Sequence, residues 1–152
     1  MTRTKPITIL VADDDPDDRL LILDAMRESH PQNEVFFVED GEELLEYLRL
    51  ENRYVGGAPR PKLILLDLNM PRKDGREVLR EIKADPELRR IPVVIFTTSS
   101  TDQDIYNSYD LGANSFITKP VTFDGLIRVI RSLEHYWFET AHLPNGSVRN
   151  GG

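Results

Sequence analysis

The sequence predicts an α/β fold, a doubly wound parallel sheet of five strands with five helices. Five short apolar runs rich in β-branched residues occur along the chain, and each is followed by a segment whose apolar side chains have helical spacing. Apolar runs without polar alternation are typical of strands that are covered on both faces. A regular alternation of strands and helices favours a parallel sheet, because parallel strands need a crossover connection.

The predicted strands are residues 7–12, 35–38, 62–66, 92–97 and 115–118. Helix boundaries are indicated by capping and helix-breaking residues. These are Asp15 and Pro16, His30 and Pro31, Asp40 and Gly41, Asp74 and Gly75, Asp85 and Pro86, and Gly112. The last helix has the clearest apolar stripe, formed by Leu126, Ile127, Ile130, Leu133 and Trp137.

A single domain is expected, since the chain has 152 residues and domains usually hold about 100–200. We assign residues 1–143 to this domain, with an extended loop at 49–60. The polar, glycine-ended stretch 144–152 is expected to be a disordered tail. We expect no second domain after residue 138.

Composition excludes several classes of function. The chain has no cysteine, so disulfides, thiolate metal sites and a cysteine nucleophile are ruled out. Its net charge of −7 argues against a nucleic-acid partner. The apolar runs are far shorter than the ~20 residues needed to cross a bilayer, so no membrane partner is expected. We therefore expect a cytoplasmic protein.

Carboxylates cluster where two predicted strands end. Asp13, Asp14 and Asp15 follow the first strand, and Asp67 follows the third. In an open parallel sheet, ligands bind outside the carboxyl ends of the strands, where the strand order reverses. Carboxylates ~5 Å apart there would repel by roughly 3 kcal/mol per pair at an effective dielectric of 20. The cluster should hold a cation or stay partly protonated, and its oxygen ligands suit Mg²⁺.

A purely structural explanation covers part of this cluster. Asp15 is a good N-cap before Pro16, and Asp17 and Asp18 suit the positive end of the helix dipole. We assign these three acids to the helix start. Asp13 and Asp14 come earlier, and capping does not explain both.

Asp67 follows four apolar residues, where an unused carboxylate would be costly. Two more predicted strands end in polar groups. Thr97 and Ser100 lie at the end of the fourth strand, and Lys119 ends the fifth. Each alone would be an ordinary hydroxyl, N-cap or surface lysine. Their joint occurrence at the strand ends indicates a functional site.

Four motifs of the sequence resemble those of the receiver domain of two-component response regulators. They are Leu-Val-Ala-Asp-Asp at 10–14, Leu-Leu-Asp-Leu-Asn-Met-Pro at 65–71 with Asp-Gly at 74–75, Phe-Thr-Thr-Ser at 96–99, and Gly-Ala-Asn-Ser-Phe-Ile-Thr-Lys-Pro at 112–120. The resemblance covers about residues 8–138 and implies the flavodoxin-like strand order 2-1-3-4-5.

The resemblance implies a role for each matching residue. Asp67 is similar to the phosphoacceptor, Thr97 to the switch hydroxyl, and Lys119 to the partner of the phosphoryl oxygens. Asp13 and Asp14 resemble the acidic pair that binds Mg²⁺ together with Asp67, although Asp13 replaces a frequent Glu.

Three further positions carry implied roles. The carbonyl of Asn69 resembles another Mg²⁺ ligand, and Phe116 stands at the position of the switch aromatic. Asn69 and Ser99 lie where the family tunes the phosphoryl lifetime.

A finer resemblance concerns the partners. The loop at 54–59, the run 97–99 and the aromatic pair Tyr136-Trp137 resemble single-domain regulators of bacterial phytochrome kinases. This implies a sensor histidine kinase as partner, with a bacterial phytochrome as one candidate. It also implies a homodimer through the C-terminal strands and helices. Because three consecutive aromatics, 136–138, cannot share one helix face, at least one should be exposed.

The expected function is to receive a phosphoryl group and switch a partner-binding surface, which is not the work of an enzyme with an external substrate. An intermediate in a phosphorelay, or a phosphate sink, remains the alternative. A phosphohydrolase with an aspartyl nucleophile would need a second Asp at position 69, where the chain has Asn. The sequence also lacks the Gly-x-Ser-x-Gly elbow of hydrolases and the glycine-rich loops of nucleotide-binding proteins.

Overall fold

The computed structural model describes residues 6–140 and contains one five-stranded parallel sheet. The strands are β1 (Thr8–Ala12), β2 (Glu34–Val38), β3 (Leu63–Leu66), β4 (Val93–Thr97) and β5 (Ser115–Thr118). Their spatial order is β2-β1-β3-β4-β5, so the predicted fold class and strand order are confirmed. Strand β1 lies between β2 and β3, and this is where the order of the sheet reverses.

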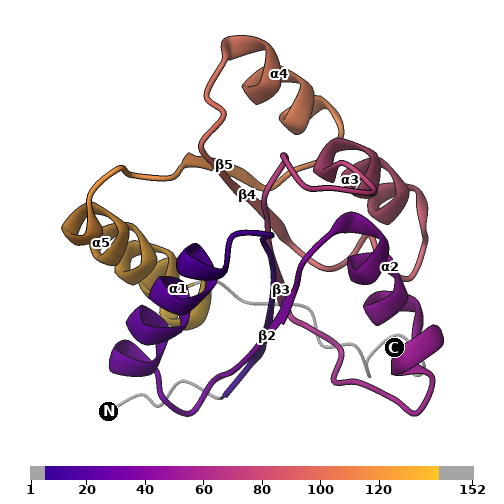
Figure 1. Ribbon diagram of the computed structural model, residues 1–152, viewed down its shortest axis with the longest axis horizontal. Helices are drawn as coiled ribbons and strands as arrows, with labels where there is room; N and C mark the ends of the chain where they lie inside the picture. Colours follow the sequence, from indigo (N-terminus) through magenta and orange to yellow (C-terminus); the bar gives the residue numbers. More distant parts are fainter. Residues whose placement is uncertain (1–5, 141–152) are drawn as a thin grey trace.

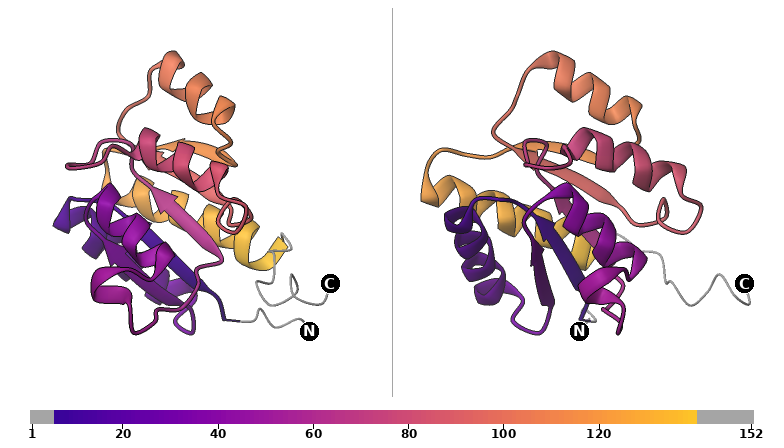
Figure 2. Two further views of the ribbon diagram at one scale, coloured as in Figure 1. Left: turned by 90° about the vertical axis from the view of Figure 1, so that its right-hand side faces the viewer. Right: turned by 45° about the vertical axis from the view of Figure 1, so that its right-hand side comes forward.

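Five α-helices connect and cover the strands, as predicted. They are α1 (Pro16–Ser29), α2 (Gly41–Arg49), α3 (Gly75–Ala84), α4 (Asp102–Asp110) and α5 (Phe123–Glu134). Helices α1 and α5 lie together on one face of the sheet, and α2 and α3 lie on the other (Figures 1 and 2). Helix α4 contacts β5 and lies at the top of the view, above α3 (Figure 1).

The core is divided into two layers by the sheet. Ile9 and Val11 of β1 point into the layer beneath α1 and α5, whereas Leu10 and Ala12 point into the layer beneath α2 and α3. Every residue of β3 and β4 is buried. The uniformly apolar strands therefore arise because both faces are covered, as the sequence predicted.

The connection between α2 and β3 is more ordered than the sequence indicated. It contains a short 3₁₀ helix, η1 (Asn52–Tyr54), which packs against α2. The Tyr54 hydroxyl donates to Glu43 Oε2 at 2.6 Å, and the Tyr47 hydroxyl donates to the Pro59 carbonyl at 2.7 Å. Aromatic side chains with hydroxyl groups thus attach a loop that glycine and proline alone would leave extended.

The end of the last helix also differs from the expectation of one regular helix. Helix α5 stops at Glu134 and continues as a π-helical segment, η2 (His135–Thr140). Tyr136 is 53% exposed while Trp137 packs on the α1/α5 core layer, so the expected exposure of at least one aromatic is confirmed. The expected tail at 144–152 lies outside the described residues.

Helix α4 ends as the sequence predicted, with a glycine just after it. Gly112 has φ of +109°, a conformation that glycine adopts without strain, and the N–H of Ala113 reaches back to the Ser108 carbonyl. Among the described residues, no helix is both long enough and apolar enough to span a membrane.

Candidate functional site

Four strand ends bring their polar residues to one edge of the sheet. Asp13 follows β1, Asp67 follows β3, Thr97 is the last residue of β4 and Lys119 follows β5. Main-chain hydrogen bonds extend the sheet ladder through this edge, from the Asp13 N–H to Val38 and from the Asp67 N–H to Ala12. The convergence expected from the sequence is therefore observed.

Both carboxylate oxygens of Asp67 have partners. Oδ1 accepts from the Thr97 hydroxyl at 2.8 Å and from the Asn69 N–H at 3.1 Å. Oδ2 accepts from Lys119 Nζ at 3.0 Å. Asp67 is only 8% exposed and Thr97 is fully buried, so these contacts lie largely out of water. Each oxygen of Asp67 thus faces a donor that can also reach a group attached there.

Lys119 is the positive centre of the site. Its Nζ contacts Asp13 Oδ2 at 2.6 Å, Asp18 Oδ2 at 2.9 Å and Asp67 Oδ2 at 3.0 Å. Burial by itself would lower the pKa of Lys119, but the hydrogen bonds to Asp13 and Asp18 and the charge of Asp67 outweigh it, so the pKa is raised above its usual range. The ammonium form is therefore firmly held at neutral pH.

The acidic pair after β1 divides into one buried and one exposed carboxylate. Asp13 is 2% exposed, while Asp14 is exposed. Burial raises the pKa of Asp13 above its ordinary value, and the hydrogen bond and charge of Lys119 only partly offset this rise. A further positive charge beside Asp13 would therefore stabilise the ionised site.

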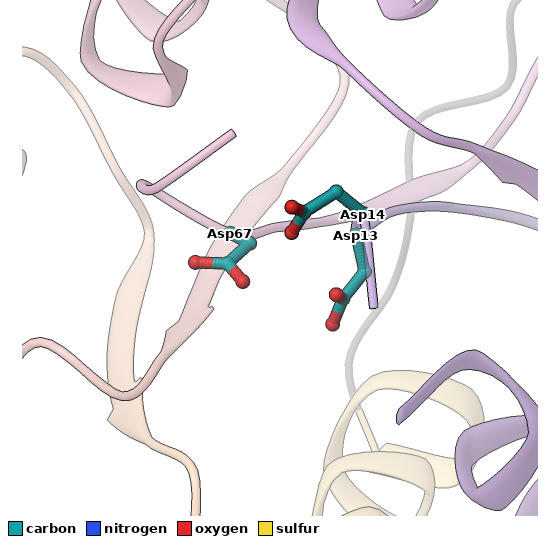
Figure 3. Close-up of side chains that lie close together, drawn as sticks. All are labelled: Asp13, Asp14 and Asp67. Atoms are coloured by element: carbon teal, nitrogen blue, oxygen red, sulfur yellow. The ribbon is translucent and has the colours of Figure 1, made fainter. Parts of the chain in front are cut away.

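The carboxylates fit a divalent cation. One oxygen from each of Asp13, Asp14 and Asp67 lies within 4.8 Å of the others. Figure 3 shows the three side chains projecting from two neighbouring strand ends toward a common space. An all-oxygen donor set of high negative charge, one of its members open to solvent, is what a hard divalent cation prefers. Asn69, the fourth expected ligand, is exposed beside Asp67.

A glycine lets the start of α3 approach the Asp67 backbone. Asp74 caps α3 by accepting from the Arg76 N–H at 2.7 Å. A Cβ added to Gly75 would lie 2.3 Å from the Asp67 carbonyl oxygen and 2.8 Å from the Leu68 Cα. Only glycine fits here, which explains the Asp-Gly pair seen in the sequence.

Ser99 belongs to a network that links the β4–α4 connection to α3. Its hydroxyl donates to Asp104, whose other carboxylate oxygen accepts from Arg76 at 2.9 Å. Arg76 also pairs with Asp74 at 3.0 Å. No spacing along the chain relates residues of α3 to residues of α4, so this network could not be predicted from the sequence.

Phe116 is half-buried and packs against the α2/α3 core layer. Its N–H donates to the hydroxyl of Tyr109 on α4 at 3.1 Å, so α4 is attached to the outer edge of β5 at this point. The switch role of Phe116 and the lifetime roles of Asn69 and Ser99 stay predictions.

Two residues of α1 join the site that the sequence analysis did not place there. Asp18, assigned to the helix start, contacts Lys119. Arg19 donates to the backbone carbonyl of Asp13 at 2.7 Å. Asp15 does cap α1 through the Asp17 N–H, as predicted.

A comparison with protein families identifies residues 9–131 as matching the response regulator receiver domain. Among curated proteins, the chain is similar to the response regulator Rcp1 of Synechocystis, with 41% identity over 139 residues. That match covers 91% of this chain and 94% of Rcp1.

Solved structures agree with this assignment. The chain superposes on the phosphorylated cyanobacterial phytochrome response regulator RcpA with a TM-score of 0.89 and 47% identity, covering 93% of this chain and 100% of RcpA. The Mn²⁺-bound form of Rcp1 gives a TM-score of 0.87 and 41% identity, covering 92% of this chain and 100% of that one. One of these relatives carries a phosphoryl group and the other a divalent metal.

Proposed function

The chain belongs to the response regulator receiver family, and on that premise we propose that Asp67 accepts a phosphoryl group from a sensor histidine kinase. The observation that carries this proposal is the surrounding of Asp67, whose two oxygens face the Thr97 hydroxyl and the Lys119 ammonium beside two further carboxylates. A carboxylate oxygen of Asp67 forms the new O–P bond while the N–P bond of the kinase phosphohistidine breaks. The histidine nitrogen keeps the electron pair and takes up a proton.

The residues of the site divide the work. Lys119 stabilises charge on the phosphoryl oxygens from one side, and its raised pKa keeps it protonated. Asp13, Asp14, Asp67 and the carbonyl of Asn69 would hold Mg²⁺. That ion would offset the negative charge of the carboxylates and of the transferring oxygens. The chain thus supplies a phosphoacceptor and the chemistry of its own phosphorylation and dephosphorylation, with no external substrate to convert.

Thr97 transmits the effect of phosphorylation from Asp67 to neighbouring elements. A phosphoryl group on Asp67 adds charge and acceptor oxygens, and the Thr97 hydroxyl turns from Asp67 to donate to them. Phe116 moves into the vacated space. Because the Phe116 N–H is held by Tyr109, this movement alters the packing of α4 on β5.

The partner kinase is proposed from the relatives. Two similar solved structures are of RcpA, described as a cyanobacterial phytochrome response regulator, and of Rcp1. A bacterial phytochrome kinase is therefore the candidate donor, and the cytoplasm is the compartment where such a kinase domain and this chain would meet.

A second copy of the chain is the proposed occupant of the β5–α5 surface. Strand β5 is an edge of the sheet, and a groove of about 380 Å³ lies beside it, lined by Ile117, Val129, Tyr136 and Trp137 among others. A strand at the edge of a sheet next to apolar side chains suits self-association. Sedimentation should detect a dimer, and monomer alone at high concentration, with and without beryllofluoride, would contradict it.

The central test is phosphorylation by a small-molecule phosphodonor with Mg²⁺, read by intact mass and peptide mapping. We expect one phosphoryl group on Asp67, lost when Mg²⁺ is chelated beforehand. Asp67→Asn should remain unlabelled, whereas Asp24→Asn, an exposed acid of α1, should label like the wild type. Labelling of Asp67→Asn at wild-type stoichiometry would overturn the assignment.

A further inference from the structure

Lys119 is held by three carboxylates that come from three different elements. Asp13 and Asp67 lie at the ends of β1 and β3, and they belong to the proposed cation site. Asp18 instead belongs to the first turn of α1. Among the carboxylates of the described residues that contact the ammonium, Asp18 is the one that lies outside the cluster of cation-binding oxygens.

Asp18 does not cap α1, so capping does not explain the position of its side chain. The N-cap of α1 is Asp15, whose side chain accepts from the Asp17 N–H. The Asp18 side chain instead turns toward Lys119 and is 29% exposed, compared with 2% for Asp13. Through Asp18, Lys119 is therefore connected to helix α1 at the solvent-facing side of the site.

The three contacts would respond differently when the site is loaded. A divalent cation among Asp13, Asp14 and Asp67 would share the charge of two of the partners of Lys119 and weaken their attraction for the ammonium. Asp18 would keep its full charge and its hydrogen bond. Phosphoryl oxygens on Asp67 would then compete with Asp18, above all, for the donors of Lys119.

We propose that Asp18 is a positioning residue that holds Lys119 back from the phosphoryl group and thereby shortens the lifetime of the phosphorylated state. This inference rests on the proposed phosphorylation of Asp67. Asp18 touches no reacting atom and acts only through the position of the ammonium.

Asp18→Asn tests this because it keeps the shape of the side chain and removes its charge. Two affinities are measured by calorimetry, for Mg²⁺ alone and for beryllofluoride at saturating Mg²⁺, together with the rate of phosphoryl loss. Freed from Asp18, Lys119 moves fully onto Asp13 and Asp67, so Mg²⁺ should bind about two- to threefold more weakly. Beryllofluoride should bind about three- to tenfold more tightly. This range corresponds to a free energy between that of an exposed ion pair and that of a buried hydrogen bond to a charged group. Phosphoryl loss should slow by a similar factor.

Opposite changes in the two affinities would distinguish a positioning role of Asp18 from damage to the site. A misfolded site would bind both Mg²⁺ and beryllofluoride more weakly. Asp17→Asn is the matched control, since it removes the same charge from the same helix turn at an exposed side chain. It should change neither affinity by more than about 1.5-fold, as expected for an exposed charge. Asp18→Glu should return both affinities toward the wild type.

A double variant separates positioning from simple through-space repulsion. In a Lys119→Met background, Asp18→Asn should no longer change the Mg²⁺ affinity, because the residue it acts through is gone. A persisting change there, or unchanged or weaker beryllofluoride binding by Asp18→Asn alone, would overturn the inference. Failure of the wild type to bind beryllofluoride would instead reject the proposed function.

Discussion

Replacing Lys119 with methionine should make the stability of the protein depend on a divalent cation. The ammonium is the only cation within 4 Å of the Asp13 and Asp67 carboxylates among the contacts of the described residues, and its side chain is 5% exposed. Methionine keeps much of the length of the side chain and removes the charge. Asp13 and Asp67 would then face each other and Asp14 with no counter-charge.

The size of the loss follows from burial. Removing one partner of a buried ion pair costs about 3–5 kcal/mol, because the remaining charge is left uncompensated. The Asp18 contact adds little, since that carboxylate is 29% exposed and can return to water. We therefore expect a loss of about 3 kcal/mol in the free energy of unfolding at pH 7 in the presence of chelator. This is a large share of the total free energy of unfolding of a typical domain.

The pH dependence has a definite sign. Burial already raises the pKa of Asp13 above 3.8 in the wild type, and loss of Lys119 removes the two largest effects that lower it. A carboxyl group with a raised pKa in the folded state favours folding when protonated, and this benefit is lost as the pH rises through that pKa. The difference between variant and wild type should therefore shrink as the pH falls toward 4.

Urea denaturation at several pH values, with chelator or with Mg²⁺, gives the measurement. Mg²⁺ should stabilise Lys119→Met more than the wild type, because the cation replaces the missing charge and binds without competition. Arg60→Met is a suitable control, since this exposed arginine donates to the Glu87 carbonyl and precedes β3, at the opposite edge of the sheet from Asp67. Equal stability of Lys119→Met and the wild type in chelator at pH 7 would refute the argument.

Two further substitutions test how the site is supported. Gly75→Ala would place a methyl group 2.3 Å from the Asp67 carbonyl, so α3 or the Asp67 backbone must move. We expect a loss of about 1–3 kcal/mol in urea denaturation and slower phosphorylation by a small-molecule donor, and an unchanged phosphorylation rate would contradict the close approach. Arg76→Gln breaks the ion pair to Asp104 and should increase amide hydrogen exchange in the β4–α4 connection while leaving that of β1 unchanged. Equal protection of the connection in both proteins would show that Arg76 does not hold it.

The strands could be predicted because the burial of a central parallel strand produces a continuous apolar run in the sequence, whereas their order followed from the resemblance to receiver domains. Four of the five runs end at, or directly before, a residue of the site, so the positions of Asp67, Thr97 and Lys119 followed from the strand ends alone. Residues of the helices were harder to place. Whether Asp18 reaches Lys119 depends on the rotation and tilt of α1 on the sheet, and no periodicity in the sequence specifies these.

The same limit applies away from the site. The η1 turn at Asn52–Tyr54 is fixed by hydroxyl contacts of Tyr47 and Tyr54 with distant residues, so local glycine and proline content predicted only a loop. The π-helical end at His135–Thr140 follows an uninterrupted apolar stripe, which looks the same in sequence as a regular helix. Tertiary contacts decide the first case, and the sequence pattern does not distinguish the second from a regular helix.

The balance of charge at the site explains why metal binding and phosphorylation should depend on each other. The ammonium of Lys119 contacts the carboxylates of Asp13, Asp18 and Asp67, and Asp14 lies beside two of them, so the site has a strong excess of negative charge. A phosphoryl group would add to that excess, whereas a divalent cation would reduce it. Each should therefore raise the affinity of the site for the other by the same factor, because coupling between two binding equilibria is reciprocal. Asp18 sets the size of this coupling, since it decides how much of the charge of Lys119 is available to the phosphoryl group.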